Sequence, residues 1–482
     1  MWRIKEKWRS IPQTVKVSVA YAVCSIIQRF LSFFTLPLFT RLLSKAQYGQ
    51  YLVYTSWTGI FSIFLTLNLA YGSFSTAMVK YDNDRDGYIS SIQGIFLALT
   101  SLFLFVYYPF RKLWNDWLGL PTFLVITLVA ETVFQNCFLL WCGKQRFEFK
   151  YKGVIGLTLL SSFLMPFISY ILVSNTDEKG YARIVGCATV NISIGLVIFI
   201  IECCKGKKLF DVEYWRYALK FNVPLIIYYL SQYIFGQSDR LVISRLEGDE
   251  KAAVYGVAYN LAIILTFVLN AINNAYVPWF YLKVRERKEE DNKKVANGIA
   301  VLMATLLSAV IWFAPEIIVI MAGEQYKEAT YVVAPVAISM IPHFYSQLFI
   351  NMEIYFEEKK TMINASVISA VINILLNLTF IKLYGYMAAA YTTLASYIVF
   401  CLLNMIGARK TVRMHGRKDV AYDYRFLFTT FVLFTLLSLC GVLLYRALIV
   451  RLLIMLIIAT LFMIKRNYFY NLYLVLKENS KS

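Results

Sequence analysis

Apolar segments of about 20 residues follow one another almost from end to end of this chain. Such a segment crosses a bilayer as one α-helix, because no water in the hydrocarbon satisfies an open backbone. We predict these segments at residues 17–39, 51–70, 89–108, 121–142, 154–173, 184–201, 223–243, 252–279, 295–321, 331–356, 363–381, 387–406, 426–445 and 448–464. The expected fold class is therefore an all-α polytopic membrane protein with about 14 transmembrane helices.

The basic residues alternate in their position along the chain. Lysine and arginine outnumber acidic residues 48 to 29, and they collect in every second loop, for example at 205–208, 283–288 and 409–418. Basic loops stay on the cytoplasmic side, so we predict that both termini lie in the cytoplasm. Contact with anionic membrane lipids accounts for the net charge of +19. Charges scattered over many short loops argue against a nucleic-acid partner.

The two halves of the chain carry matching residues. Gln28 in the first segment and Arg41 just after it return at the same spacing as Gln232 in the seventh segment and Arg245 just after that. This predicts an internal duplication, which is typical of transporters whose site lies between two like halves. We therefore expect an N-terminal six-helix lobe at 1–205 and a C-terminal six-helix lobe at 206–408. Two additional C-terminal helices and a cytoplasmic tail follow at 409–482.

Motifs of enzymes and metalloproteins are missing from the sequence. No loop is long enough for a soluble catalytic domain, and neither a phosphate-binding glycine loop nor an HExxH helix occurs. The eight cysteines lie in or beside apolar segments without metal-ligand spacing, and there are only two histidines. We predict no catalytic residues, no metal and no cofactor.

Charged side chains inside the apolar segments are the first functional candidates, because each is costly in hydrocarbon unless it faces a polar cavity. Arg29 lies near the middle of the first segment. It either pairs with a buried carboxylate or faces a water-filled lumen, where its two parallel donors suit a phosphate. Arg240 in the seventh segment either reaches outward or faces the same lumen. Gln28 and Gln232 either bind sugar hydroxyls or tie helices together.

Three further titratable residues are candidates for coupling or gating. Glu131, midway along the fourth segment, is a partner of Arg29, a hydrogen-bonding residue between helices, or a proton or cation site. His343 in the tenth segment is a structural side chain or a gate that titrates near neutral pH. Asp239 directly precedes Arg240, and because neighbours in a helix point in different directions, the two need not pair.

Four short stretches of the sequence resemble a known family. Residues 36–43 (LPLFTRLL) and 48–51 (YGQY), which follow Arg29, are similar to the N-terminal signature of bacterial polysaccharide flippases. These are the Wzx-type O-antigen and capsule exporters of the MATE-like MOP superfamily. Residues 239–243 (DRLVI) and 255–256 (YG) resemble the counterpart of that signature in the second half.

The resemblance implies two six-helix bundles around a cationic central cavity, with two additional C-terminal helices. It implies export of undecaprenyl-pyrophosphate-linked oligosaccharide from the inner to the outer leaflet, by alternating access, for cell-surface polysaccharide biosynthesis. Basic cavity residues of the family engage the pyrophosphate, and this role carries over to Arg29, with Asp239 and Arg240 as the matching positions in the second half. A polysaccharide polymerase and a chain-length regulator are the implied protein partners.

Two other functions stay open on the sequence. A cation-coupled multidrug or small-molecule antiporter has the same fold, but drug exporters of this superfamily use buried carboxylates for cationic substrates. The first segment here carries the cation Arg29 instead. A membrane-embedded glycosyltransferase or polymerase usually has a large loop with catalytic carboxylates or arginines, and this chain has none. We therefore expect a lipid-linked oligosaccharide flippase and not an enzyme.

Overall fold

The chain folds into helices, as the apolar segments predict. The computed structural model describes residues 13–263, 266–417 and 422–464, and this part of the chain contains helices but no strand. Two compact units are present, Met1–Tyr233 and Ile234–Ser482, called the N-unit and the C-unit below. The predicted all-α fold is confirmed, whereas the predicted divisions at residues 205 and 408 stay predictions.

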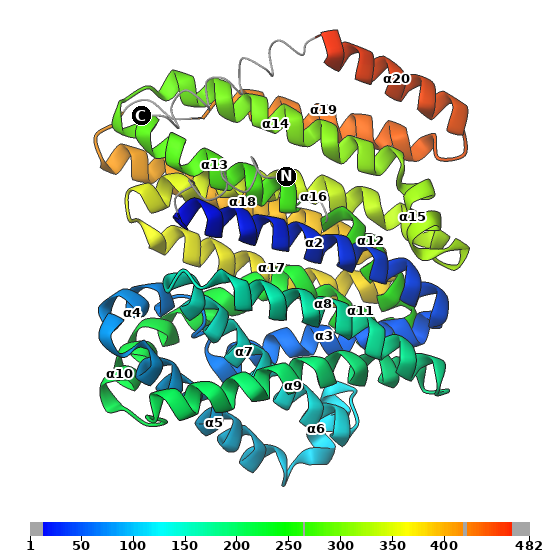
Figure 1. Cartoon of the computed structure of the whole chain (residues 1–482). Coiled ribbons are helices and arrows are strands. Elements are labelled where there is room, and N and C mark those ends of the chain that lie inside the picture. Colours follow the sequence, from blue (N-terminus) through cyan, green and yellow to red (C-terminus); the bar gives the residue numbers. More distant parts are fainter. Residues whose placement is uncertain (1–12, 264–265, 418–421, 465–482) are drawn as a thin grey trace, which may run out of the picture. The chain divides into compact units, whose positions relative to one another are not determined.

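The N-unit is built around α9, which packs against α3, α5, α7 and α8, while α2 lies along α8 (Figure 1). Its helices are α2 (Gln13–Leu42), α3 (Lys45–Thr66), α4 (Phe74–Lys80), α5 (Arg85–Tyr107), α6 (Arg111–Leu118), α7 (Thr122–Phe147), α8 (Tyr151–Ser174), α9 (Lys179–Gly206) and α10 (Val212–Asn222). Short 3-10 turns lie at η1 (Asp82–Asp84) and η2 (Val223–Leu225), and α11 (Ile226–Glu247) begins in this unit. The duplicated Arg41 and Arg245 lie in the last turns of α2 and α11.

Two glycines let α9 approach its neighbours closely. A Cβ atom on Gly195 would lie 2.1 Å from the backbone oxygen of Phe134 in α7. A Cβ on Gly186 would lie 2.6 Å from the Cα of Ser169 in α8. Helices in a membrane are held together by close packing, because lipid tails remove the hydrophobic drive for association. The two glycines therefore fix where α9 crosses α7 and α8.

We expect Gly195→Ala to destabilise the protein by about 1–3 kcal/mol, the usual cost of overpacking a tight contact. The added methyl group meets backbone, which cannot rotate away. The measurement is thermal unfolding of the purified protein in detergent. Gly156→Ala in α8 is the matched control, because no atom lies within 4 Å of its Cβ position. Equal unfolding temperatures for the two variants would contradict the close α7–α9 contact.

A buried lysine holds one end of the N-unit. Lys144 near the end of α7 forms ion pairs with Asp86 in the first turn of α5 and with Glu202 in the last turns of α9. The side chains of Lys144 and Glu202 are 2% and 0% exposed, whereas Asp86 is 46% exposed. A charge this deeply buried is tolerated only with a partner, so Lys144 and Glu202 depend on each other.

The C-unit is built around α16, whose side chains are almost all buried and which packs against α12, α14, α18 and α19. Its elements after α11 are α12 (Asp249–Ile263), α13 (Thr266–Arg285), α14 (Glu289–Trp312), α15 (Ala314–Ala322), η3 (Glu324–Ala329), α16 (Thr330–Tyr355), α17 (Lys359–Tyr384), α18 (Ala388–Met414), α19 (Tyr424–Leu443) and α20 (Leu448–Ile464). The single helix predicted at 295–321 is wrong, because α14 and α15 are separate. Pro315 in the first turn of α15 lacks the N–H that a continuous helix needs.

Eleven helical stretches of the described chain are long and apolar enough to cross a membrane, judged by length and composition. The other three predicted segments correspond to α3, α11 and α20, which are also helices. α20 is short, with 17 residues, and α3 and α11 carry many polar side chains. The count of about 14 is therefore not confirmed, although each predicted segment contains a helix.

Candidate functional site

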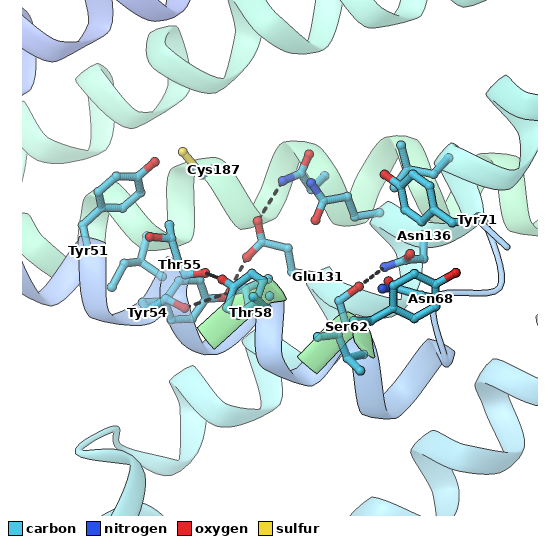
Figure 2. Close-up of a pocket in the computed structure, with 18 of the residues that line it drawn as sticks. Tyr51, Tyr54, Thr55, Thr58, Ser62, Asn68, Tyr71, Glu131, Asn136 and Cys187 are labelled. Carbon is cyan, nitrogen blue, oxygen red and sulfur yellow. Dashed lines mark hydrogen bonds between the residues drawn. The ribbon is translucent and has the colours of Figure 1, made fainter. Parts of the chain in front are cut away.

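The N-unit holds a polar cavity of about 780 Å³, which we call the Glu131 cavity (Figure 2). Side chains from α3, α7, α9 and the first turns of α11 line it. On α3 the lining residues include Tyr51, Thr55, Thr58 and Ser62, spaced three or four apart and so on one helix face. The polar face of α3 toward this cavity explains why that helix is not apolar enough to count as a membrane span.

Glu131 of α7 lies at the centre of this cavity with both carboxylate oxygens occupied (Figure 2). One oxygen accepts a hydrogen bond from the Tyr54 hydroxyl of α3 and the other from the Asn191 amide of α9, each at 2.7 Å. Glu131 is thus a hydrogen-bonding residue between helices, and the alternative of an ion pair with Arg29 is not realised. A role of Glu131 in coupling stays a prediction.

Asn136, about 1.4 turns further along α7, also forms a hydrogen bond to α3. Its amide donates to the Ser62 hydroxyl of α3 at 3.0 Å (Figure 2). Two polar bridges therefore cross from α7 to α3 along the same wall of the Glu131 cavity. Neither Tyr54 nor Ser62 carried a signal in the sequence, because a single tyrosine or serine in an apolar helix is common.

The two duplicated glutamines line two adjoining cavities of the N-unit. Gln232 lines the Glu131 cavity. Gln28 lines a second cavity of about 540 Å³, which we call the Arg183 cavity, and donates to the Ser162 hydroxyl at 3.1 Å. Both cavities share a set of lining residues, namely Tyr51, Gln135, Leu139, Met165, Cys187 and Asn191. They are therefore neighbouring parts of one polar interior.

Arg29 takes a different position from Gln28. Its side chain is exposed on α2, and it lines neither of these two cavities. Neighbouring residues on a helix point about 100° apart, so Gln28 and Arg29 face different surroundings. The prediction that Arg29 binds an anionic headgroup therefore stays a prediction.

A buried cation of the N-unit was missed in the sequence. Arg183 in the second turn of α9 is 6% exposed and lines the Arg183 cavity. Its guanidinium carbon lies 3.6 Å from the ring centre of Phe39 and 4.9 Å from that of Tyr51. The predicted apolar segment starts at residue 184, whereas α9 starts at Lys179. Arg183 therefore falls just before the predicted segment, although it lies inside α9.

In the C-unit, Asp239 of α11 is the centre of a buried polar network. It is 2% exposed and accepts hydrogen bonds from Tyr255 of α12, Asn377 of α17 and Thr393 of α18. The last two distances are 2.6 and 2.7 Å. Ser238 also donates to Asn373 of α17 at 3.2 Å. Four helices therefore meet at one carboxylate.

Arg240 donates its hydrogen bonds to residues other than the preceding Asp239, a possibility that the sequence left open. Its guanidinium donates to the side-chain oxygens of Gln237 and Asn260, at 2.8 and 2.9 Å. It also lies 5.1 Å from the ring centre of Tyr259. At 5% exposure, Arg240 is held inside the C-unit and does not reach outward.

His343 of α16 lines a smaller cavity of about 240 Å³ in the C-unit, together with Asn270, Asn273 and Gln347. Its ring contacts that of Tyr397 edge-to-face at 4.9 Å, and its Nδ1 is buried without a hydrogen-bond partner. The gate role of His343 stays a prediction. Among the described residues, no group of three or more histidine, cysteine, aspartate or glutamate side chains is placed to hold a metal ion.

Comparison with protein families gives two matches. The model for the family described as polysaccharide biosynthesis protein matches residues 15–282, and the MatE model matches residues 224–379. Among curated proteins of Haemophilus influenzae, the Lsg locus putative protein 1 is 24% identical over 396 residues, which cover 74% of this chain and 88% of that protein. An uncharacterized membrane protein of the same organism is 22% identical over 291 residues, covering 56% and 66%.

Solved structures share the fold at low sequence identity. The lipid II flippase MurJ in an inward closed conformation matches with a TM-score of 0.61 and 15% identity, covering 89% of this chain and 100% of that one. An inward-facing multidrug resistance MATE family transporter of the MOP superfamily matches with a TM-score of 0.59 and 13% identity, covering 84% and 100%. A MOP superfamily transporter from Pyrococcus furiosus matches with a TM-score of 0.54 and 13% identity, covering 85% and 96%.

Proposed function

This multi-pass membrane protein belongs to the polysaccharide biosynthesis protein family, and on that premise we propose that it is a flippase for undecaprenyl-pyrophosphate-linked oligosaccharide. The family resemblance found in the sequence is confirmed. We place the protein in the bacterial inner membrane with both termini in the cytoplasm, where it moves its cargo outward by alternating access. The observation that carries the proposal is a large polar cavity inside a membrane protein of this family.

The chemistry of the Glu131 cavity supports a sugar-bearing cargo. A headgroup of several sugars cannot enter bare hydrocarbon, because its polar groups lose water without replacement. The cavity offers amides from Gln135 and Gln232, a hydroxyl from Thr58, and the rings of Tyr51 and Tyr71. Its volume of about 780 Å³ lies within the usual range of ligand sites, about 300–1,000 Å³. The polyprenyl tail remains in the lipid throughout.

We propose that Arg29 and Arg240, with Gln28 and Gln232, bind the pyrophosphate and the sugars nearest to it. Gln237 and Asn260 each accept one hydrogen bond from Arg240, and its Nε is buried without a partner, so donors remain for an anion.

The direction of transport follows from charge. An inside-negative membrane potential favours outward movement of each negative charge by about 2.3 kcal/mol per 100 mV. Glu131, Asp239 and His343 are the proposed coupling or gating residues, should the potential not suffice. A polysaccharide polymerase with its chain-length regulator would consume the exported lipid-linked oligosaccharide. The lower concentration of cargo in the outer leaflet also favours net outward transport.

The rival within the same fold is a cation-coupled multidrug antiporter, which the likeness to MATE transporters supports. A membrane-embedded glycosyltransferase has less support, because the similar solved structures are a lipid II flippase and a multidrug resistance transporter. Reconstitution of the purified protein in vesicles with fluorescent undecaprenyl-pyrophosphate oligosaccharide decides between them. We expect the headgroup to become accessible to an impermeant reagent on the opposite leaflet. Uptake of fluorescent cations with no such movement would refute the flippase.

Arg29→Ala is expected to slow this movement at least about tenfold, because a charged hydrogen bond to the headgroup is worth about 1.5–3 kcal/mol. Arg29→Lys retains the charge but not the planar fork, and we expect an intermediate rate. The assay is the same vesicle reconstitution, with equal protein in each preparation. Unchanged transport by Arg29→Ala would remove Arg29 from the binding site.

A further inference from the structure

Arg183 is a buried guanidinium without an acceptor. Its Nε and Nη1 atoms are buried and make no hydrogen bond, although a charge in the protein interior is normally paired. Its contacts are the rings of Phe39 in α2 and Tyr51 in α3. Aromatic rings hold the plane of a guanidinium and leave its N–H donors at the edge unused. The donors of Arg183 are therefore positioned but not satisfied.

The cavity that Arg183 lines is a polar one. α2 contributes Ser25, Gln28 and Thr35 to its wall, and α8 contributes hydroxyl groups from Thr158 and Ser162. The residues that line it, all within the described part of the N-unit, include two arginines and no aspartate or glutamate. Glu131 lines the adjoining cavity and has both oxygens occupied. The Arg183 cavity thus suits an anion.

The second arginine of the cavity, Arg146, lies near its other end. The guanidinium carbon of Arg146 is 5.0 Å from the ring centre of Tyr21, near the start of α2, whereas that of Arg183 lies on Phe39 near the end of α2. At 1.5 Å per residue, these two rings are separated by roughly 27 Å along the helix axis. Arg146 is exposed and Arg183 is buried. The two cations therefore lie toward opposite ends of the Arg183 cavity, Arg146 at the exposed end and Arg183 at the buried end.

We propose that the Arg183 cavity binds an oxyanion of the transported headgroup, with Arg146 as the first contact and Arg183 as the second. The oxyanion is a phosphate of the lipid diphosphate or a carboxylate of an acidic sugar, both of which a guanidinium binds through two parallel donors. In the proposed orientation, α7 ends on the cytoplasmic side of the membrane, near Arg146, and α9 begins on the outer side, near Arg183. An anion that passes from Arg146 to Arg183 therefore moves outward. The inference rests on the proposed function and names the anion site that serves it.

The test is anion binding to the purified full-length protein in detergent, measured by calorimetry with inorganic pyrophosphate and, separately, with glucuronate. We expect at least one of them to bind, and Arg183→Gln to weaken that binding at least about tenfold, equivalent to about 1.4 kcal/mol. Arg183→Lys should fall between the two. Arg111→Gln is the matched control, because Arg111 also lies over a tyrosine ring, that of Tyr108, but is exposed on the short helix α6.

Thermal unfolding separates a binding arginine from a structural one. Arg183→Gln loses the ring contacts with Phe39 and Tyr51. It also removes a buried charge whose Nε and Nη1 atoms lack an acceptor. These effects oppose each other, so we expect an unfolding temperature close to that of the wild type. The anion that binds should raise the unfolding temperature of the wild type but not that of the variant. A lower unfolding temperature for unliganded Arg183→Gln would mark Arg183 as structural and overturn the proposal.

Binding of neither anion by the wild type, or equal binding by Arg183→Gln, would also overturn it. The vesicle assay keeps this result apart from the proposed function. Headgroup movement that is undiminished in Arg183→Gln, together with unchanged binding, contradicts only the Arg183 site. Binding that depends on Arg183 in a protein that moves no lipid-linked sugar contradicts only the flippase and leaves the anion site in place.

Discussion

Lys144→Met is expected to lower the free energy of unfolding by about 3–5 kcal/mol, the usual result of removing one partner of a buried ion pair. The variant leaves Glu202, with a 0% exposed side chain, without its cation. It also removes the ion pairs that join the end of α7 to Asp86 of α5 and to Glu202 of α9. The measurement is thermal or denaturant unfolding of the purified protein in detergent, compared with the wild type.

Two further variants isolate the cause of this loss. Lys150→Met removes a lysine that pairs with Glu148 but is 68% exposed, so we expect a change of at most about 1 kcal/mol. Lys144→Met combined with Glu202→Leu removes both buried charges and should regain much of the stability, since an apolar pair of similar volume is tolerated there. A double variant as unstable as Lys144→Met alone would show that the packing of Lys144 matters and not its charge.

The apolar segments predict the helices of this fold, but apolar content alone does not show which of these helices qualify as membrane spans. α3 and α11 were predicted from their apolar content, yet each carries a polar face, and residues of both line the Glu131 cavity. Hydropathy averages over a whole helix, so a helix that lines a cavity loses apolar character on one side. The break before α15 had a visible signal in Pro315, which an average over 27 residues of apolar sequence concealed.

Sequence reasoning located three buried charges but not their partners, and it missed Arg183. Glu131, Asp239 and Arg240 stood out because each interrupts an apolar segment, and all three are buried. Their partners Asn191, Asn377 and Asn260 are ordinary polar residues far along the chain or on the next helix, and only helix packing brings them together. Long-range hydrogen bonds of this kind leave no local pattern in a sequence.

Glu131 and Asp239 play corresponding parts in the two units. Each is a buried carboxylate that accepts hydrogen bonds from a tyrosine hydroxyl and an asparagine amide on neighbouring helices. Asp239 accepts a third bond from Thr393. In each unit, therefore, one acidic side chain joins several helices through its hydrogen bonds. This makes the donors around each carboxylate depend on it as much as it depends on them.

Asp239→Ala is therefore expected to lower the free energy of unfolding by about 3 kcal/mol or more, because Tyr255, Asn377 and Thr393 each lose a buried acceptor. Asp239→Asn keeps the shape and one acceptor oxygen but turns the other into a donor, and we expect a smaller loss. Asp423→Ala is the control: it removes a single backbone cap at the start of α19, with an expected cost of about 1 kcal/mol. Thermal unfolding in detergent ranks the three variants.

The same variants separate anchoring from coupling at Asp239. If this carboxylate only holds α11 against α12, α17 and α18, headgroup movement in vesicles should fall in Asp239→Asn no further than its stability does. If it also binds the coupling proton or cation, Asp239→Asn should stop transport at temperatures where the variant remains folded, because the amide does not ionise. Full transport by a folded Asp239→Asn protein would exclude Asp239 as the coupling residue and leave Glu131 and His343 as the remaining candidates among those predicted.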